Sequence, residues 1–238
     1  MSTNTTPTTA LPQPTRIGTT VLRRVAGGLA LAHIVLLFAG FSQESSTEHG
    51  TALSDFTRII GGADSTRTMI GGYIEAMAFL VLVPALVVVA MLLSRRTEVG
   101  RIAATSFLAL GAAYVASTLA VGFPPGAAAL YGLQHGADAH AASMVMDIRN
   151  YGFYLQVALS SAMALTLGIA ALAERSNVRW VGWGGVGFGV VGLIATPFAH
   201  NVVSMGWVIW WVGLGVLFLR GDGEPRQSRV RATSDAAS

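Results

Sequence analysis

One acidic residue, Glu75, stands inside an apolar stretch that is long enough to cross a lipid bilayer, residues 70–94. A carboxylate at that depth can pair with a cation, exchange a proton or bind a ligand, and it is costly unless its charge is compensated. By the rise of a helix, Glu75 lies roughly 8 Å from the beginning of this stretch. It therefore indicates a functional site near one membrane surface.

Further polar residues gather at the same depth on other helices. Asn150 and Tyr154 lie one helical turn apart at the start of residues 148–173, so they share a face. We predict a ligand-binding pocket from six residues: Glu75, Asp147, Arg149, Asn150, Tyr154 and His200. Arg149 is expected to pair with Glu75, either to lock two helices together or at the mouth of the pocket.

Three histidines carry weaker signals. His135 and His140 flank Asp138 and are weak candidates for a metal site, but a polar connection explains them better, so no metal is predicted. His33 lies within residues 23–41 and could ligate haem only with a second histidine at the same depth. A hydrogen bond to a neighbouring helix explains His33 better, and no cofactor is predicted.

The composition is that of an integral membrane protein. The chain has 238 residues, of which 53% are hydrophobic and 11% charged, whereas a soluble domain has about 25% charged residues. The absence of cysteine excludes disulfides and thiolate metal sites. All 15 basic residues are arginine, which suggests a GC-rich bacterial genome. The arginines flank apolar stretches, so membrane topology explains the basic pI and a nucleic-acid partner is not expected.

Six apolar stretches predict an all-α fold, a polytopic bundle of six transmembrane helices over residues 21–220. The spans are expected at residues 23–41, 70–94, 102–122, 148–173, 180–199 and 203–219. The first is expected to be an uncleaved helix rather than a signal peptide, because no A-x-A site follows it. Residues 1–20 and 221–238 have little to bury and are predicted to be disordered tails.

The arginines also predict the orientation. With the N-terminus inside, the inner segments hold twelve arginines and the outer segments three. The positive-inside rule therefore places both termini in the cytoplasm of a multi-pass protein of the bacterial inner (plasma) membrane. Of the two long outer connections, residues 42–69 are expected to contain an amphipathic helix at the membrane interface. In residues 123–147, paired prolines are expected to end the preceding helix.

Small and aromatic residues suggest how the helices pack. Gly185 and Gly189 recur at helical spacing and predict a face where another helix approaches closely. The tryptophans are interpreted as inner and outer aromatic belts: Trp180, Trp183, Trp207, Trp210 and Trp211.

The stretches "GGYIEAMAFLVLVPALVVVAMLLSRR" and "DIRNYGFYLQVALSSAMALTLGIAALAERSNVRWVGWGGVGFGVVG" resemble a bacterial integral-membrane family known as domain of unknown function 4386. In that family a glutamate in the second helix, an Arg-Asp or Arg-Asn pair opening the fourth, and an Arg-Trp re-entry into the fifth recur. The matching residues here are Glu75, Arg149 with Asn150, and Arg179 with Trp180 and Gly182. The resemblance implies the six-helix plan and favours Glu75 and Arg149, and it implies no biochemical activity.

The function favoured by these features is binding, sensing or permeation of a small ligand through an outward-facing polar pocket. One alternative is an accessory or structural subunit of a membrane complex, in which the pocket serves only helix packing. Another is a membrane enzyme acting on a lipid or small molecule. An enzyme is less favoured, because the chain has no HExxH, GxSxG or paired-carboxylate signature.

Overall fold

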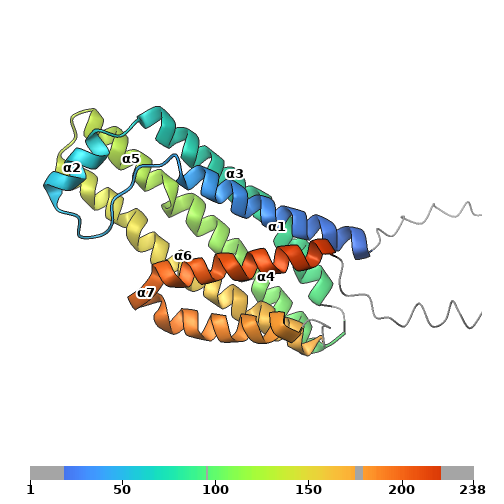
Figure 1. Cartoon of the computed structure of the whole chain (residues 1–238). Coiled ribbons are helices and arrows are strands. Elements are labelled where there is room, and N and C mark those ends of the chain that lie inside the picture. Colours follow the sequence, from blue (N-terminus) through green and yellow to red (C-terminus); the bar gives the residue numbers. More distant parts are fainter. Residues whose placement is uncertain (1–18, 95, 175–178, 221–238) are drawn as a thin grey trace, which may run out of the picture.

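The chain is all-helical in the computed structural model, which describes residues 19–94, 96–174 and 179–220. No strand occurs in these ranges, which confirms that the fold is all-α (Figure 1). Their seven helices are α1 (Thr19–Phe41), α2 (Leu53–Gly61), α3 (Ser65–Leu93), α4 (Glu98–Val121), α5 (Phe123–Gln134), α6 (Ala139–Ala173) and α7 (Arg179–Arg220). Residues 1–18 and 221–238 of the predicted tails lie outside the described residues, and α1 already includes the last residues of the first tail.

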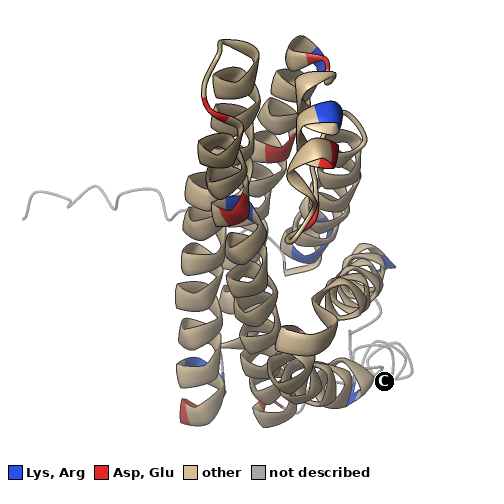
Figure 2. Ribbon diagram, turned by 90° about the vertical axis from the view of Figure 1, so that its left-hand side faces the viewer, with Lys and Arg blue, Asp and Glu red and all other residues tan. Residues whose placement is uncertain are grey.

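Within the described ranges, five helical segments are long and apolar enough to cross a membrane: α1, α3, α4 continued by α5, α6, and α7. Their outward faces are apolar too, since Phe198 is 87% exposed and Ile209 is 69% exposed. Figure 2 shows that most of the helical ribbon carries no charged residue. Apolar surface this extensive is unfavourable in water and suits contact with lipid. The helices therefore have the length and the surface of a multi-pass membrane protein.

Helix α7 consists of two arms joined by a sharp reversal. Ala199 has non-helical backbone angles, φ −145° and ψ 39°, and follows shortly after Pro197, which cannot donate a helical hydrogen bond. Figure 1 shows the second arm, in red, folded back along the first, in orange. A Cβ built on Gly206 would lie 2.8 Å from the ring of Phe188, so the arms are in contact. The reversal falls where the sequence predicts the break between the last two spans.

The bundle has two different ends. At one end α1 begins against the end of α7, where a Cβ on Gly27 would lie 2.6 Å from the carbonyl oxygen of Gly215. The end of α3, the start of α4, the end of α6 and the start of α7 lie at this end too (Figure 1). We call it the basic end, because its described residues include six arginines: Arg23, Arg24, Arg96, Arg101, Arg179 and Arg220. The opposite end carries α2, α5 and residues 42–52, which together we call the cap.

The cap differs from its sequence prediction in the placement of α2. Helix α2 is the expected amphipathic helix, but Phe56 and Ile60 are buried in a small core with Leu130 of α5 and Met146 of α6. Its apolar face therefore packs on protein rather than on the membrane interface. As predicted, the paired prolines follow directly on the end of the preceding helix, since α4 ends at Val121. They stand in the first turn of α5, where a missing N–H breaks no helical hydrogen bond.

An aromatic cluster fills the middle of the bundle. Trp207 stacks on Trp211 with ring centroids 5.3 Å apart, and both are buried. Trp210 is buried beside them, so the prediction that these three tryptophans form part of an aromatic belt is wrong. Trp180 and Trp183 are exposed, as a belt requires.

The contacts predicted for His33 and for the glycines of α7 are confirmed. His33 of α1 is fully buried, and its Nδ1 lies 2.9 Å from the carbonyl oxygen of Ala78 in α3. A Cβ on Gly185 would lie 2.7 Å from the carbonyl oxygen of Ala164 in α6, and Gly189 meets α6 as closely. These small residues let the first arm of α7 lie directly on the backbone of α6.

Candidate functional site

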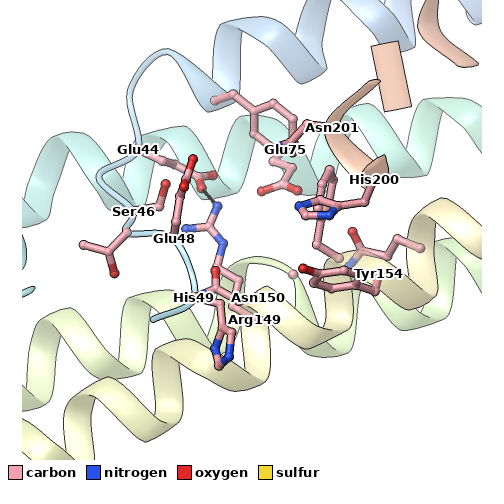
Figure 3. A pocket seen from close by; sticks show the side chains of 15 residues that line it. Glu44, Ser46, Glu48, His49, Glu75, Arg149, Asn150, Tyr154, His200 and Asn201 are labelled. Carbon is pink, nitrogen blue, oxygen red and sulfur yellow. Dashed lines mark hydrogen bonds and ion pairs between the residues drawn. The ribbon is translucent and has the colours of Figure 1, made fainter. Parts of the chain in front are cut away.

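A cavity of about 530 Å³ lies under the cap, where α1, α3, α6 and the reversal of α7 meet. Figure 3 shows the side chains that surround it. Five of the six predicted site residues line the cavity: Glu75, Arg149, Asn150, Tyr154 and His200. The rest of the wall consists of Phe41, Glu44, Ser46, Thr47, Glu48, His49, Gly122, Phe153, Gln156 and Asn201. The fold thus brings residues from five separate parts of the sequence to one place.

Glu75 projects from α3 into the cavity (Figure 3) and is only 4% exposed. Its Oε2 atom has no hydrogen-bond partner among the described residues. Close packing of α1 on α3 fixes this turn, because a Cβ on Gly40 would lie 2.8 Å from the carbonyl oxygen of Gly71 and 3.0 Å from the backbone nitrogen of Glu75. The end of α1 therefore lies directly on the turn that carries Glu75.

The ion-pair partner of Arg149 is Glu44 rather than Glu75, so the predicted pairing is wrong. Arg149 Nη2 donates to Glu44 Oε2, with the side chains 14% and 2% exposed, respectively. Glu44 follows the end of α1, and a Cβ on Gly71 would lie 2.9 Å from Glu44 Cγ. The packing that fixes Glu75 therefore also brings Glu44 within reach of Arg149. Glu75 lies close enough to the Glu44 carboxyl group to share a proton with it in a hydrogen bond, and close enough to Arg149 to feel its charge.

Asp147, the sixth predicted residue, stands behind the wall and holds His49. His49 Nδ1 donates to Asp147 Oδ1 at 3.1 Å, and the hydroxyl of Tyr151 lies 3.2 Å from His49 Nε2. Asn150 also donates weakly to Asp147, at 3.4 Å. Asp147 therefore acts on the cavity by orienting a histidine that lines it.

The reversal of α7 brings His200 and Asn201 to the cavity, directly after Ala199. The His200 ring lies 4.2 Å from the ring of Tyr154, measured between centroids. Gln156 lines the wall from α6; it is 8% exposed, and its Nε2 has no partner among the described residues. The wall therefore combines aromatic rings with polar groups that the protein leaves unused.

The charges of the cavity are mainly acidic. Of the described residues, Glu44, Glu48 and Glu75 line it together with a single arginine, Arg149, which Glu44 binds. A buried acceptor without a partner costs about 1–3 kcal/mol. The arrangement can bind a proton or a ligand that offers N–H or O–H donors. In the described part of the chain no three His, Cys, Asp or Glu side chains are grouped so that they could hold a metal ion.

The weak metal candidates lie away from the cavity. His135 stacks on Tyr131 with ring centroids 3.9 Å apart, and its Nδ1 lies 2.8 Å from the Tyr131 carbonyl oxygen. Asp138 caps α6 by accepting a hydrogen bond from the backbone N–H of Ala141 at 3.0 Å. His140 is exposed in the first turn of α6. Local helix structure accounts for these residues.

Sequence reasoning missed Glu44, Glu48, His49 and Gln156 as wall residues. The signal that could have found the first three is the polar run after the first span, which lies at the same membrane surface as Glu75. Nothing in that run distinguishes Glu44 from Glu48. Only the packing of α1 on α3 decides which carboxylate reaches Arg149.

Comparison of this chain with protein-family models, with curated proteins and with solved structures gave no match. The resemblance to the family of membrane proteins stays a prediction. The function is therefore inferred from the cavity and the residues around it.

Proposed function

We propose that this protein binds a small polar molecule in the cavity under the cap and is a multi-pass protein of the bacterial inner (plasma) membrane. One observation carries the proposal: Glu75, 4% exposed, directs a carboxylate oxygen without a partner into a cavity of about 530 Å³. A glutamate needed only for packing would have to share a proton with Glu44 or leave that acceptor uncompensated, at a cost of about 1–3 kcal/mol. A bound ligand with donor groups removes this cost. A binding protein, a sensor and a channel or carrier would all need this binding of a ligand in the cavity.

Six membrane crossings, with both termini in the cytoplasm, are part of the proposal. Each arm of α7 has about 20 residues, enough for a helix of roughly 30 Å that crosses the hydrocarbon layer. The six arginines of the basic end outnumber the three beyond the opposite surface: Arg58, Arg67 and Arg149. The positive-inside rule then puts the basic end in the cytoplasm and the cavity at the outer surface. Reporter fusions test this topology. Reporters inserted at Ser46 and Gly136 should lie outside the cell, whereas a reporter at the C-terminus that lies outside would contradict six crossings.

A cavity-filling variant with a matched control tests ligand binding. Asn201→Trp places an indole at the cavity wall, whereas Val202→Trp changes the next residue, which is 73% exposed and not part of the wall. Thermal unfolding of the purified full chain is measured with small amines, carboxylates, sugars and amides. A ligand at a hundred times its Kd adds about 2.7 kcal/mol to stability.

We expect at least one solute class to raise the unfolding temperature of the wild type and of Val202→Trp but not of Asn201→Trp. If no class separates the two variants, the cavity serves only helix packing, as in an accessory subunit, and the proposed function is wrong. If the solute that binds is chemically changed, the protein is an enzyme, the second alternative.

A further inference from the structure

We propose that the ligand of this cavity carries a primary ammonium group with a hydrogen-bond-accepting oxygen close to it, as in an amino alcohol. This inference rests on the proposed function and names its ligand class. It stands on the unpartnered atoms of three side chains that line the cavity: Glu44, Glu75 and Gln156.

The unused acceptors call for a cation with N–H donors. Glu44 binds Arg149 through Oε2 only, and its Oε1 is buried without a partner among the described residues. Glu75 Oε2 is in the same state, with 4% of the residue exposed. An anion entering the cavity would meet both carboxylates, whereas an ammonium group donates to both and balances the second negative charge. A quaternary ammonium has no N–H and would leave both acceptors unsatisfied.

One donor is also left open. Gln156 Nε2 lines the same cavity and has no partner in the described part of the chain. A hydroxyl or carbonyl oxygen on the ligand would accept from it. The three unpartnered atoms therefore match a molecule with a cationic donor group and a neutral acceptor, not a bare cation.

The wall and the volume favour an organic ion over a metal ion. Phe41, Phe153 and Tyr154 line the cavity, and aromatic faces attract ammonium groups within about 6 Å. At about 530 Å³ the space is far larger than the roughly 30 Å³ that one water occupies in the liquid. A single metal ion would leave most of it unfilled, whereas a small organic molecule can contact the carboxylates and the rings together.

This chemistry has two sources at a membrane surface: a free amine outside the cell, and the ethanolamine headgroup of a lipid. Ethanolamine is therefore the probe. Choline keeps the charge but lacks N–H donors, and ethylene glycol keeps the size and the oxygen but lacks the charge. Affinity for the three is measured by calorimetry on the purified full chain in detergent. We expect ethanolamine to bind at least tenfold more tightly than choline, and ethylene glycol not to bind.

The affinities of the wild-type protein for the three probes decide whether the ligand is an ammonium compound, and no variant is needed. Equal binding of ethylene glycol and ethanolamine, tighter binding of choline, or binding of carboxylates or sugars with no amine bound would overturn the ammonium assignment. The last result would leave the proposed function intact, because a cavity ligand would still exist. Loss of every solute effect would instead remove the proposed function itself.

Two matched variants test the assigned carboxylate. Glu75→Gln keeps the side-chain size and should weaken ethanolamine binding at least tenfold. Asp55→Asn removes an exposed acid of the cap that does not line the cavity and should weaken it less than threefold, because solvent screens that charge. An equal loss of ethanolamine affinity in both variants would mean that the overall negative charge attracts the ligand, and would overturn specific recognition by Glu75.

Reconstitution separates the two sources. In nanodiscs of phosphatidylcholine, free ethanolamine should bind as it does in detergent. In nanodiscs containing phosphatidylethanolamine, binding of free ethanolamine is lost if the headgroup already fills the cavity and is unchanged if the natural ligand is a free amine. Either result supports the ammonium class, and failure to bind in phosphatidylcholine nanodiscs contradicts it.

Discussion

Glu174 and Glu75 are both buried, one toward each end of the bundle, and the fold surrounds them differently. Glu174, at the end of α6, is 8% exposed and accepts hydrogen bonds from the backbone nitrogens of Arg96 and Thr97, both at 2.9 Å. Thr97 is the N-cap of α4, so this carboxylate lies at a helix N-terminus, where the helix dipole stabilises an anion. Glu75 is 4% exposed, and one of its carboxylate oxygens has no partner in the described residues.

The difference separates a structural role from a binding role. Glu174 joins α6 to α4 and uses its charge within the protein. Glu75 faces a cavity, and Arg149, the one arginine that the described part of the chain brings to the cavity wall, is bound by Glu44. Two buried residues of the same type therefore predict opposite responses to substitution. The predictions below test that contrast, from the largest expected effect to the smallest.

Removing the cation of the cavity should have the largest effect on stability. Arg149→Met leaves Glu44, whose side chain is 2% exposed, as a buried charge without its partner, and loss of one member of a buried pair costs about 3–5 kcal/mol. The free energy of unfolding should fall by that amount. The double variant Arg149→Met with Glu44→Gln should recover much of the loss, whereas Arg149→Met with Glu75→Gln should recover little. The opposite ranking would mean that Glu75 is the true partner.

Substitution of Glu174 should have the second largest effect on stability. Glu174→Ala leaves the N–H groups at the start of α4 without their acceptor, and hydrogen bonds to charged groups contribute about 1.5–3 kcal/mol. Stability measured by thermal unfolding should fall by about 3 kcal/mol or less, while ligand binding in the cavity is unchanged. Altered affinity at the cavity would show that the two ends are coupled, contrary to this account.

Substitution at the contact between α1 and α3 should have the third largest effect on stability. A Cβ at Gly40 would lie 2.8 Å from a backbone oxygen of α3, whereas one at Gly28 on the same helix meets nothing within 4 Å. Gly40→Ala should therefore cost about 1–3 kcal/mol of stability by overpacking and weaken binding, because α1 carries Glu44 to the cavity. Gly28→Ala should be neutral or slightly stabilising. Equal effects would mean that helix propensity, not packing, decides.

The long apolar stretches made the helices predictable, because few other structures satisfy the backbone in a bilayer. The site was predictable in part, because polar residues within a membrane-spanning stretch are energetically costly. This cost singled out Glu75, Asn150 and Tyr154. Helical spacing placed Asn150 and Tyr154 on one face. Whether these residues bind a ligand stays a prediction.

Pairing could not be predicted, since it depends on contacts between distant segments. Glu44 and Glu75 are equivalent partners for Arg149 in the sequence, and the meeting of Gly40 with Gly71 decides between them. Tryptophan is a residue type typical of aromatic belts, yet the reversal of α7 turns Trp207 into the core. Periodicity describes one helix at a time and gives no information about which helices meet.

The most direct test of the central claim compares Glu75→Gln with Glu174→Gln in the same detergent, without ligand. The claim is that the protein's own contacts satisfy Glu174 and leave Glu75 open for a ligand. Glu174→Gln should lower the unfolding temperature by several degrees, since about 1 kcal/mol corresponds to about 2–4 °C in a chain of this size. Glu75→Gln should leave it unchanged or raise it, because it removes a charge that the fold does not compensate. A fall for Glu75→Gln as large as that for Glu174→Gln would contradict the account.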